Sequence, residues 1–318
     1  MTSSLDRRII ATLAYSSLFS FPLSFSELSV RLVSQRALAE ELNQDGYRTD
    51  LSKIKQVGNA ELKSGLKRLE KQGLVKHQED YWLLAVDKNK KLPEKRLLKQ
   101  QISLNLKKNF TQIIAMLKSL PQVRAAAATG SLAVSNAVPD DDIDLMLVAK
   151  SGALWKTRLS VLRQASKKGN RVGESDGKPG WCCNLWLETD ALKLPAGKRN
   201  LFTAYQVMQT EWFYDPDGIE LEWIENNLWA QAYLPNLLQS KEINSGSKRA
   251  RSKERYSWSC SPANIIAYGL QKIYLPTVTG IPSSNLKLKQ AFLHKFDSQQ
   301  LILSKWRRKT LRSFRLLK

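Results

Sequence analysis

The sequence is poor in residues that build disulfide frameworks or histidine-based sites. Of its 318 residues, three are cysteine and two are histidine. Cys182 and Cys183 are adjacent inside an apolar stretch, so the three cysteines cannot form a disulfide framework and lack metal-ligand spacing. His77 has no second histidine nearby, and His294 follows Phe292 closely, which is typical of a packing histidine. The lack of a disulfide framework favours a reducing, cytoplasmic location.

Long apolar runs are also missing. No stretch reaches the roughly 18 apolar residues that span a bilayer. Arg7-Arg8 and the apolar residues after them resemble the start of a signal peptide, but three serines and Pro22 interrupt the run, and no clean cleavage site follows. The apolar residues instead share one helical face, which predicts a core helix at 5–20.

Acidic residues are scarce. The chain has 29 Asp and Glu against 50 Lys and Arg, a net charge of +21, with 42% apolar residues and a mean hydropathy of −0.37. The composition is typical of a soluble globular protein, and the length allows two or three domains. The positive charge favours a polyanionic partner such as nucleic acid or nucleotide, although solubility alone gives the same number.

Against this basic background, four acids stand together at 140–144, DDDID. Asp142 and Asp144 take alternate positions of a predicted strand, so they share a face. Two carboxylates this close repel each other unless a cation lies between them, and Mg²⁺ is the natural one. Upstream, Gly130 lets a phosphate approach the backbone, and Ser131 offers an N–H and a hydroxyl. An exposed acidic loop before an ordinary buried strand is the alternative.

The order Gly130-Ser131, ten residues, Asp142-Ile143-Asp144 resembles the signature of the DNA polymerase beta-like nucleotidyltransferase superfamily. The wider chain resembles bacterial nucleotidyltransferase-domain proteins that carry a winged-helix-like segment in front and helices behind. The matching segments are FPLSFSEL at 21–28, TGSLAVSNAVPDDDIDLMLV at 129–148, LWKTR at 154–158, CCNLWL at 182–187 and YLPN at 233–236. The likeness thus runs from about residue 5 to residue 240.

The resemblance implies an α+β fold with three parts: a winged-helix-like module at 1–87, a central mixed sheet flanked by helices at 88–240, and a basic helical region at 241–318. It implies transfer of a nucleoside monophosphate from a nucleoside triphosphate (NTP) to a hydroxyl acceptor. Asp142 and Asp144 would hold Mg²⁺ and be catalytic, while Gly130 and Ser131 would bind the β- and γ-phosphates. The acceptor stays unknown.

Active members of the superfamily place a third carboxylate on a neighbouring strand. In the strand predicted at 181–188, the mid-strand polar residue is Asn184, which can bind a ligand but cannot act as a base. Strand alternation puts Glu188 on the face of Asn184, and Glu188 is the substitute catalytic carboxylate. Arg158 is a candidate to reach a phosphate, but a salt bridge on the helix surface is the interpretation that we favour. Because of Asn184, a catalytically inactive nucleotide- or nucleic-acid-binding regulator is the alternative function.

The module at 1–87 contains the elements of a winged helix. We expect a helix capped by Ser24 or Ser26, a helix capped by Asn59, and a hairpin around the HQED turn at 77–80. The Asn59 helix has a basic face made of Lys63, Lys67, Arg68 and Lys71. This face would enter a DNA groove, but a solvated helix face is the interpretation that we favour.

Charged residues are concentrated in two further segments. A charged linker at 87–96 leads into one long helix that ends at Leu120. Residues 241–318 hold 17 Lys and Arg against three acids. Their clusters, KRARSKER and SKWRRKTLRSFRLLK, favour nucleic acid, with Trp306 and Phe314 suited to stacking on its bases. A basic amphipathic helix against anionic lipid or an acidic protein is the alternative.

Overall fold

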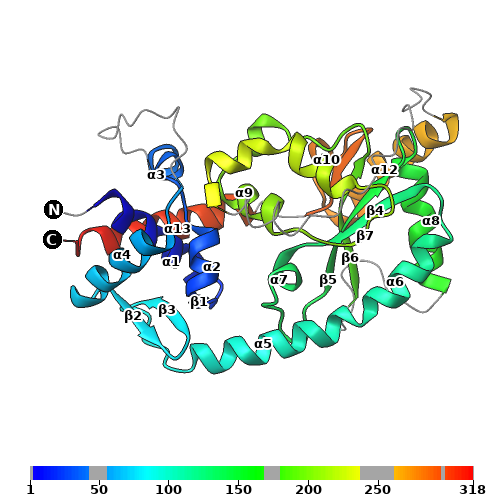
Figure 1. Ribbon diagram of the computed structural model, residues 1–318. Coiled ribbons are helices and arrows are strands. Elements are labelled where there is room, and N and C mark those ends of the chain that lie inside the picture. Colours follow the sequence, from blue (N-terminus) through cyan, green and yellow to red (C-terminus); the bar gives the residue numbers. More distant parts are fainter. Residues whose placement is uncertain (1–2, 43–55, 168–179, 237–260, 295–297, 318) are drawn as a thin grey trace.

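The computed structural model describes residues 3–42, 56–167, 180–236, 261–294 and 298–317. Within them, helices surround two separate sheets, so the chain has a mixed α and β fold as expected (Figure 1). No described helix combines the length and the apolar character needed to cross a membrane.

The first two helices each begin with a capping box. Helix α1, Ser4–Ser17, begins at Ser3, whose side chain accepts from the Asp6 N–H while the Asp6 carboxylate accepts from the Ser3 N–H. Helix α2, Phe25–Arg31, begins at Ser24 with the same reciprocal pattern. Ser24, and not Ser26, is therefore the cap. Most of α1 is buried, which confirms that the apolar run after Arg7 and Arg8 is a core helix.

The rest of the N-terminal module pairs two helices with a small sheet. The helices are α3, Gln35–Leu42, and α4, Asn59–Lys71. The cap of α4 is Gly58, without a side-chain bond, so the expectation of an Asn59 cap is wrong. Strands β2, Val75–Gln78, and β3, Tyr81–Leu84, form the expected hairpin, and β1, Leu23–Ser24, pairs with β3 to give the antiparallel order β1-β3-β2.

The helix expected up to Leu120 is two helices. They are α5, Leu92–Lys107, and α6, Asn109–Lys118, and the break lies at Lys108. α5 runs from the N-terminal module to the second sheet (Figure 1). Its buried positions include Arg96 and Ser103, whereas Leu97 is exposed. The apolar pattern of α5 therefore marks its packed face only in part, since Ile102 and Leu106 pack against the core whereas Leu97 does not.

The second sheet has the strand order β7-β4-β5-β6-β8. Its strands are β4, Val123–Ala128, β5, Ile143–Ala149, β6, Trp181–Glu188, β7, Glu211–Tyr214, and β8, Gln290–Phe292. β5 and β6 are parallel, and the other pairs are antiparallel. The sheet is thus mixed, as predicted.

Each face of this sheet packs on its own set of helices. The face with Ala127, Met146 and Leu187 belongs to the core that includes α9, Leu201–Gln209, and α10, Ile219–Asn226. The opposite face belongs to the core formed by α6, α8 and α12. The last two are Leu154–Lys167 and Pro262–Thr279. We call these the α9 face and the α8 face.

The described part of 241–318 is divided among the other elements rather than forming a unit of its own. α12 packs on α8, β8 closes one edge of the second sheet, and α13, Ser298–Phe314, packs on α1 and α9. Trp306 is fully buried, and its Nε1 donates to the Ala11 carbonyl over 2.9 Å. The expectation that Trp306 stacks on nucleic acid is therefore wrong, because its ring anchors α13 in the core.

Candidate functional site

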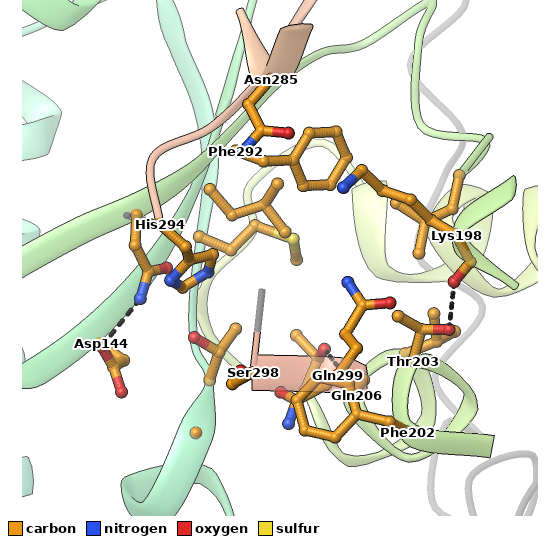
Figure 2. Close-up of a pocket in the computed structure, with 18 of the residues that line it drawn as sticks. Asp144, Lys198, Phe202, Thr203, Gln206, Asn285, Phe292, His294, Ser298 and Gln299 are labelled. Atoms are coloured by element: carbon orange, nitrogen blue, oxygen red, sulfur yellow. Dashed lines mark hydrogen bonds between the residues drawn. The ribbon is translucent and has the colours of Figure 1, made fainter. Parts of the chain in front are cut away.

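A cavity of about 450 Å³ lies on the α9 face of the second sheet (Figure 2). Its size is within the range of small-molecule sites. Gly130, Asp144 and Asn184 contribute from the sheet side, Phe202 and Gln206 from α9, and Phe292 and His294 from β8 and the residues after it. Segments far apart in the sequence therefore build one concave site.

Asp144 lies on β5 at the cavity wall. Its Oδ1 accepts a hydrogen bond of 2.8 Å from the Asn184 side chain (Figure 2). Burial, and to a smaller extent the charges of Asp142 and Asp141, raise the pKa of Asp144 to about 7, although a hydrogen bond with the Cys182 side chain acts in the opposite direction. This carboxyl group therefore changes charge near neutral pH.

Gly130 fits closely against Asp144. Its φ is +63°, a left-handed conformation that glycine adopts without strain. A Cβ atom on Gly130 would lie 2.4 Å from Asp144 Oδ2, far inside van der Waals contact. The Thr129 N–H also donates to the Asp144 carbonyl over 2.9 Å. Gly130 is thus required for the approach of Asp144 as well as for the turn into the short helix α7, Gly130–Ala133.

The loop between α7 and β5 is closed by Ser131 and Asp141. The Ser131 hydroxyl donates to Asp141 Oδ2 over 2.7 Å, and the Val138 N–H donates to the same oxygen over 3.0 Å. In this arrangement the Ser131 hydroxyl holds the loop. A phosphate at Ser131 would therefore meet the backbone N–H, which lies in the first turn of α7 and has no partner inside that helix.

Asp142 stands just before β5, and its Oδ1 accepts from the Gly180 N–H over 2.7 Å. Among the described residues, no group of three or more His, Cys, Asp or Glu side chains is placed to hold a metal ion. The second oxygens of Asp142 and Asp144 take no part in the bonds to Gly180 and Asn184. Mg²⁺ needs one or two carboxylates, with water and phosphate completing its shell, so this oxygen donor pair fits it in chemical type.

Glu188 does not join the aspartates. It lies opposite Ala149 at the far end of β6, whereas Asp144 lies opposite Cys182. Its Oε1 accepts from the N–H groups of Ala153 and Leu154, each over 3.0 Å, at the start of α8. The assignment of Glu188 as the substitute catalytic carboxylate is therefore not met, because its side chain caps α8.

A bulge in β6 explains why strand alternation misplaced Glu188. The pairing with β5 shifts between Cys183, opposite Leu145, and Leu185, opposite Met146. Asn184 and Leu185 both line the cavity, and Trp186 packs in the core of the α8 face. Beyond the bulge the faces are exchanged. Glu188 therefore reaches α8 instead of the cavity.

Arg158 also lies away from the cavity. It is on α8, and its Nη1 donates to Gln271 Oε1 of α12. Burial lowers its pKa. The expectation that Arg158 reaches a phosphate is not met, because its guanidinium joins two helices on the α8 face.

The basic face of α4 is exposed as expected, but one of its members is already paired. Arg68 contacts both carboxylate oxygens of Asp6, with Nη2 at 2.6 Å and Nε at 3.0 Å. This bidentate bond ties α4 to the start of α1. Lys63, Lys67 and Lys71 remain on the exposed face.

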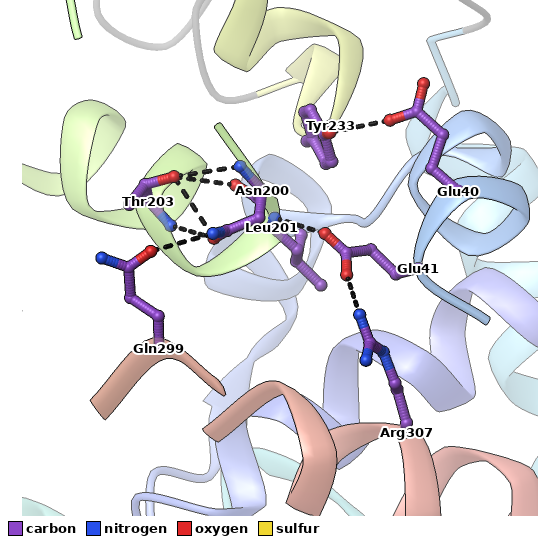
Figure 3. Close-up of polar contacts among 8 residues, drawn as sticks. All are labelled: Glu40, Glu41, Asn200, Leu201, Thr203, Tyr233, Gln299 and Arg307. Carbon is purple, nitrogen blue, oxygen red and sulfur yellow. Dashed lines mark hydrogen bonds and ion pairs between the residues drawn. The ribbon is translucent and has the colours of Figure 1, made fainter. Parts of the chain in front are cut away.

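Hydrogen bonds hold the first turn of α9, the helix that forms one wall of the cavity (Figure 3). Asn200 caps α9 through Thr203, and its Nδ2 donates to Gln299 Oε1 of α13 over 3.0 Å. Glu41 of α3 accepts from the Leu201 N–H and from Arg307, each over 2.9 Å. Contacts with α3 and α13 therefore fix this wall of the cavity.

Sequence reasoning missed the residues on the side of the cavity remote from Asp144. Lys198 lies with its Nζ 4.7 Å from the centre of the Phe292 ring (Figure 2). Phe202 also lines this part, whereas His294 lies on the side of Asp144 (Figure 2). No motif links these residues, which come from separate segments, although His294 had been expected to pack rather than to face a cavity.

No protein-family model matches the chain, and comparisons with curated proteins and with solved structures give no significant match. The functional proposal therefore rests on the residues of this chain.

Proposed function

We propose that the chain is a Mg²⁺-dependent nucleotidyltransferase that transfers a nucleoside monophosphate from an NTP to a hydroxyl acceptor. The observation that carries the proposal is the contact of Gly130 with Asp144 at the wall of the cavity. It joins the two halves of the Gly-Ser and Asp-x-Asp pattern, which lie on different elements. A largely buried carboxyl whose pKa is raised by burial and by two neighbouring acids is also a group that a divalent cation would stabilise in its charged form.

In this proposal the chain supplies position and charge. Asp142 and Asp144 hold Mg²⁺, which when bound neutralises charge on the phosphates. The backbone at Gly130 and Ser131 binds phosphate oxygens. The cavity holds the rest of a substrate between the sheet and α9, away from bulk water. The position of Gly130 and Asp144 at the cavity wall supports this arrangement, because a phosphate bound there would lie next to the space that takes the rest of the substrate.

The contact of Asn184 with Asp144 favours a second candidate, a nucleotide- or nucleic-acid-binding regulator without catalysis. Asn184 of β6 donates its side-chain hydrogen bond to Asp144, and an amide is not a base at neutral pH. Glu188 is on the α8 face and cannot replace it. This candidate predicts nucleotide binding without release of pyrophosphate.

One experiment separates the two candidates. Pyrophosphate release and nucleotide binding are measured for the whole chain with each of the four NTPs and Mg²⁺, with RNA, protein and small-molecule acceptor pools. Asp144→Ala and Asp142→Ala are compared with Asp140→Ala, an exposed acid of the same loop. Release that is lost in the first two variants but not in the third supports the enzyme.

Binding without release in every pool supports the regulator. Absence of both binding and release from the folded wild-type chain contradicts both candidates.

A further inference from the structure

α13 carries a strongly basic surface that the proposed function does not use. Residues 298–317 contain six Lys and Arg and no acid. Four of these cations, Lys305, Arg308, Lys309 and Arg312, line one side of a hollow of about 490 Å³. Their spacing of three or four residues puts them on one helical face. We call this hollow the α13 hollow.

The floor and rim of the α13 hollow are aliphatic. Leu18 at the end of α1, Val86 after β3 and Leu316 after α13 line it together with the cations. Val86 is 50% exposed and Leu316 is 52% exposed. This surface combines a row of cations with exposed aliphatic side chains. It suits a ligand whose acidic groups meet the cations while its apolar groups meet the aliphatic side chains.

Three of the four cations are available for such a ligand. Lys309 pairs with Asp87 over 2.6 Å. Among the described residues, none makes an ion pair with Lys305, Arg308 or Arg312, and all three are exposed. The hollow therefore presents uncompensated positive charge directly beside its aliphatic floor.

The residues and the shape of the α13 hollow decide which class of acidic ligand fits it. Nucleic acid bound without sequence preference uses aromatic side chains as stacking platforms. Here Trp306 is buried, and Phe314 packs against the core with the guanidinium of Arg7 over its ring, at 5.6 Å, so the described residues that line the hollow include no aromatic ring. A flat bilayer surface does not fill a concave site. A peptide side chain can enter the hollow while its neighbours meet the cations.

We propose that the α13 hollow is a docking site for an acidic amphipathic peptide segment of a partner protein. An apolar side chain of the segment contacts Leu18, Val86 and Leu316. Its Asp or Glu side chains pair with Lys305, Arg308 and Arg312. The segment lies along α13, as an amphipathic helix does in an apolar groove.

The test uses the full chain and a dye-labelled peptide in which Glu residues are interspersed with Leu at helical spacing. A second peptide has Ser in place of Leu and the same charge. By fluorescence anisotropy, the Leu peptide should bind about tenfold more tightly than the Ser peptide, because a buried Leu adds apolar contact. Arg308→Glu with Arg312→Glu should weaken binding of the Leu peptide by about tenfold or more.

The matched control is Arg163→Glu with Lys167→Glu on α8, which changes the net charge equally at two exposed positions. It should bind like the wild type. Val86→Ser should reduce the preference for the Leu peptide while leaving binding of the Ser peptide unchanged. Circular dichroism and the melting temperature establish that each variant is folded.

Three outcomes would overturn the proposal. The wild type could fail to distinguish the Leu peptide from the Ser peptide. The α13 variant and the α8 control could lose binding equally, which would mean that only net charge matters. Oligouridylate or phosphatidylglycerol vesicles could bind more tightly than the Leu peptide and displace it, which would assign the surface to nucleic acid or to lipid.

Discussion

The side-chain amide of Asn184 donates a hydrogen bond of 2.8 Å to Oδ1 of Asp144. A neutral donor thus holds one oxygen of a carboxyl group whose pKa is raised to about 7. The bulge in β6 turns Asn184 towards the cavity together with Leu185. The contact makes the site sensitive to any change that adds or removes a negative charge at either residue.

Asn184→Asp should convert this contact into a carboxylate pair. Without Mg²⁺ at pH 8, we expect a loss of stability of about 1–3 kcal/mol, because the hydrogen bond is lost and two buried charges repel. Mg²⁺ should raise the melting temperature of this variant more than that of the wild type. Thermal melts with and without Mg²⁺ measure both effects.

Asn227→Asp is the control for this substitution. Asn227 is fully buried and its Nδ2 donates to the carbonyls of Leu192 and Trp223, away from the aspartates. Its loss of stability should not respond to Mg²⁺. An equal response of both variants would contradict a cation site at Asp142 and Asp144.

Asp144→Asn should stabilise the metal-free protein above neutral pH. Because the folded pKa is about 7 and the ordinary value is 3.8, the folded state binds the extra proton between those values. Stability from this group is therefore lost as pH rises through 7. We expect a gain of about 2 kcal/mol for Asn at pH 8 that disappears near pH 4, measured by urea unfolding.

The Asn side chain keeps an acceptor oxygen for Asn184, so the variant removes charge while retaining the bond. Asp140→Asn, at an exposed position of the same loop, should leave the pH dependence unchanged. A gain for Asp144→Asn that is equal at pH 4 and pH 8 would show that the pKa of Asp144 is the same in the folded and unfolded states, which contradicts a raised folded pKa.

Glu188→Ala should lower stability by about 1–2 kcal/mol, because the N–H groups of Ala153 and Leu154 lose their acceptor at the start of α8. Glu188→Gln keeps an acceptor oxygen and should be far less harmful. Burial raises the pKa of Glu188, so loss of its charge is tolerated. Turnover and nucleotide binding by the Gln variant should match the wild type. A large loss of either in a folded Gln variant would restore a functional role for Glu188.

The elements that depend on neighbouring residues were predictable from the sequence. Ser3 with Asp6 and Ser24 with Glu27 form capping boxes through bonds that span three residues. Short-range patterns also predict the hairpin of β2 and β3 and the strands around Gly130 and Asp144, because apolar runs and turn residues act locally. Local rules therefore gave the class of fold and located Asp144 and Gly130 in the candidate site.

Features that depend on distant partners were not predictable. Arg96 lies in the segment expected to be a charged linker, yet it is 2% exposed. It donates to the Ser135 carbonyl in the loop after α7 and to Glu27, 2.9 Å away. Its partners lie 39 and 69 residues away in the sequence, so no local pattern reports them. The bulge that sends Glu188 to the α8 face is likewise a property of strand pairing.

Gly130→Ala tests the close approach that carries the functional proposal. An alanine pays a conformational cost at a φ of +63°, of about 1–2 kcal/mol. Its Cβ would also lie 2.4 Å from Asp144 Oδ2, so the carboxylate must move. We expect stability to fall by more than the conformational cost alone, and nucleotide binding to be lost even in the folded fraction.

Gly73→Ala separates these two effects. Gly73 has a φ of +70°, but a Cβ there would meet no atom within 4 Å. It should therefore show the conformational cost without any effect on nucleotide binding. Urea unfolding and nucleotide titration of the two variants give the comparison. If Gly130→Ala lost no more stability than Gly73→Ala and still bound nucleotide, the contact between Gly130 and Asp144 would not belong to a nucleotide site.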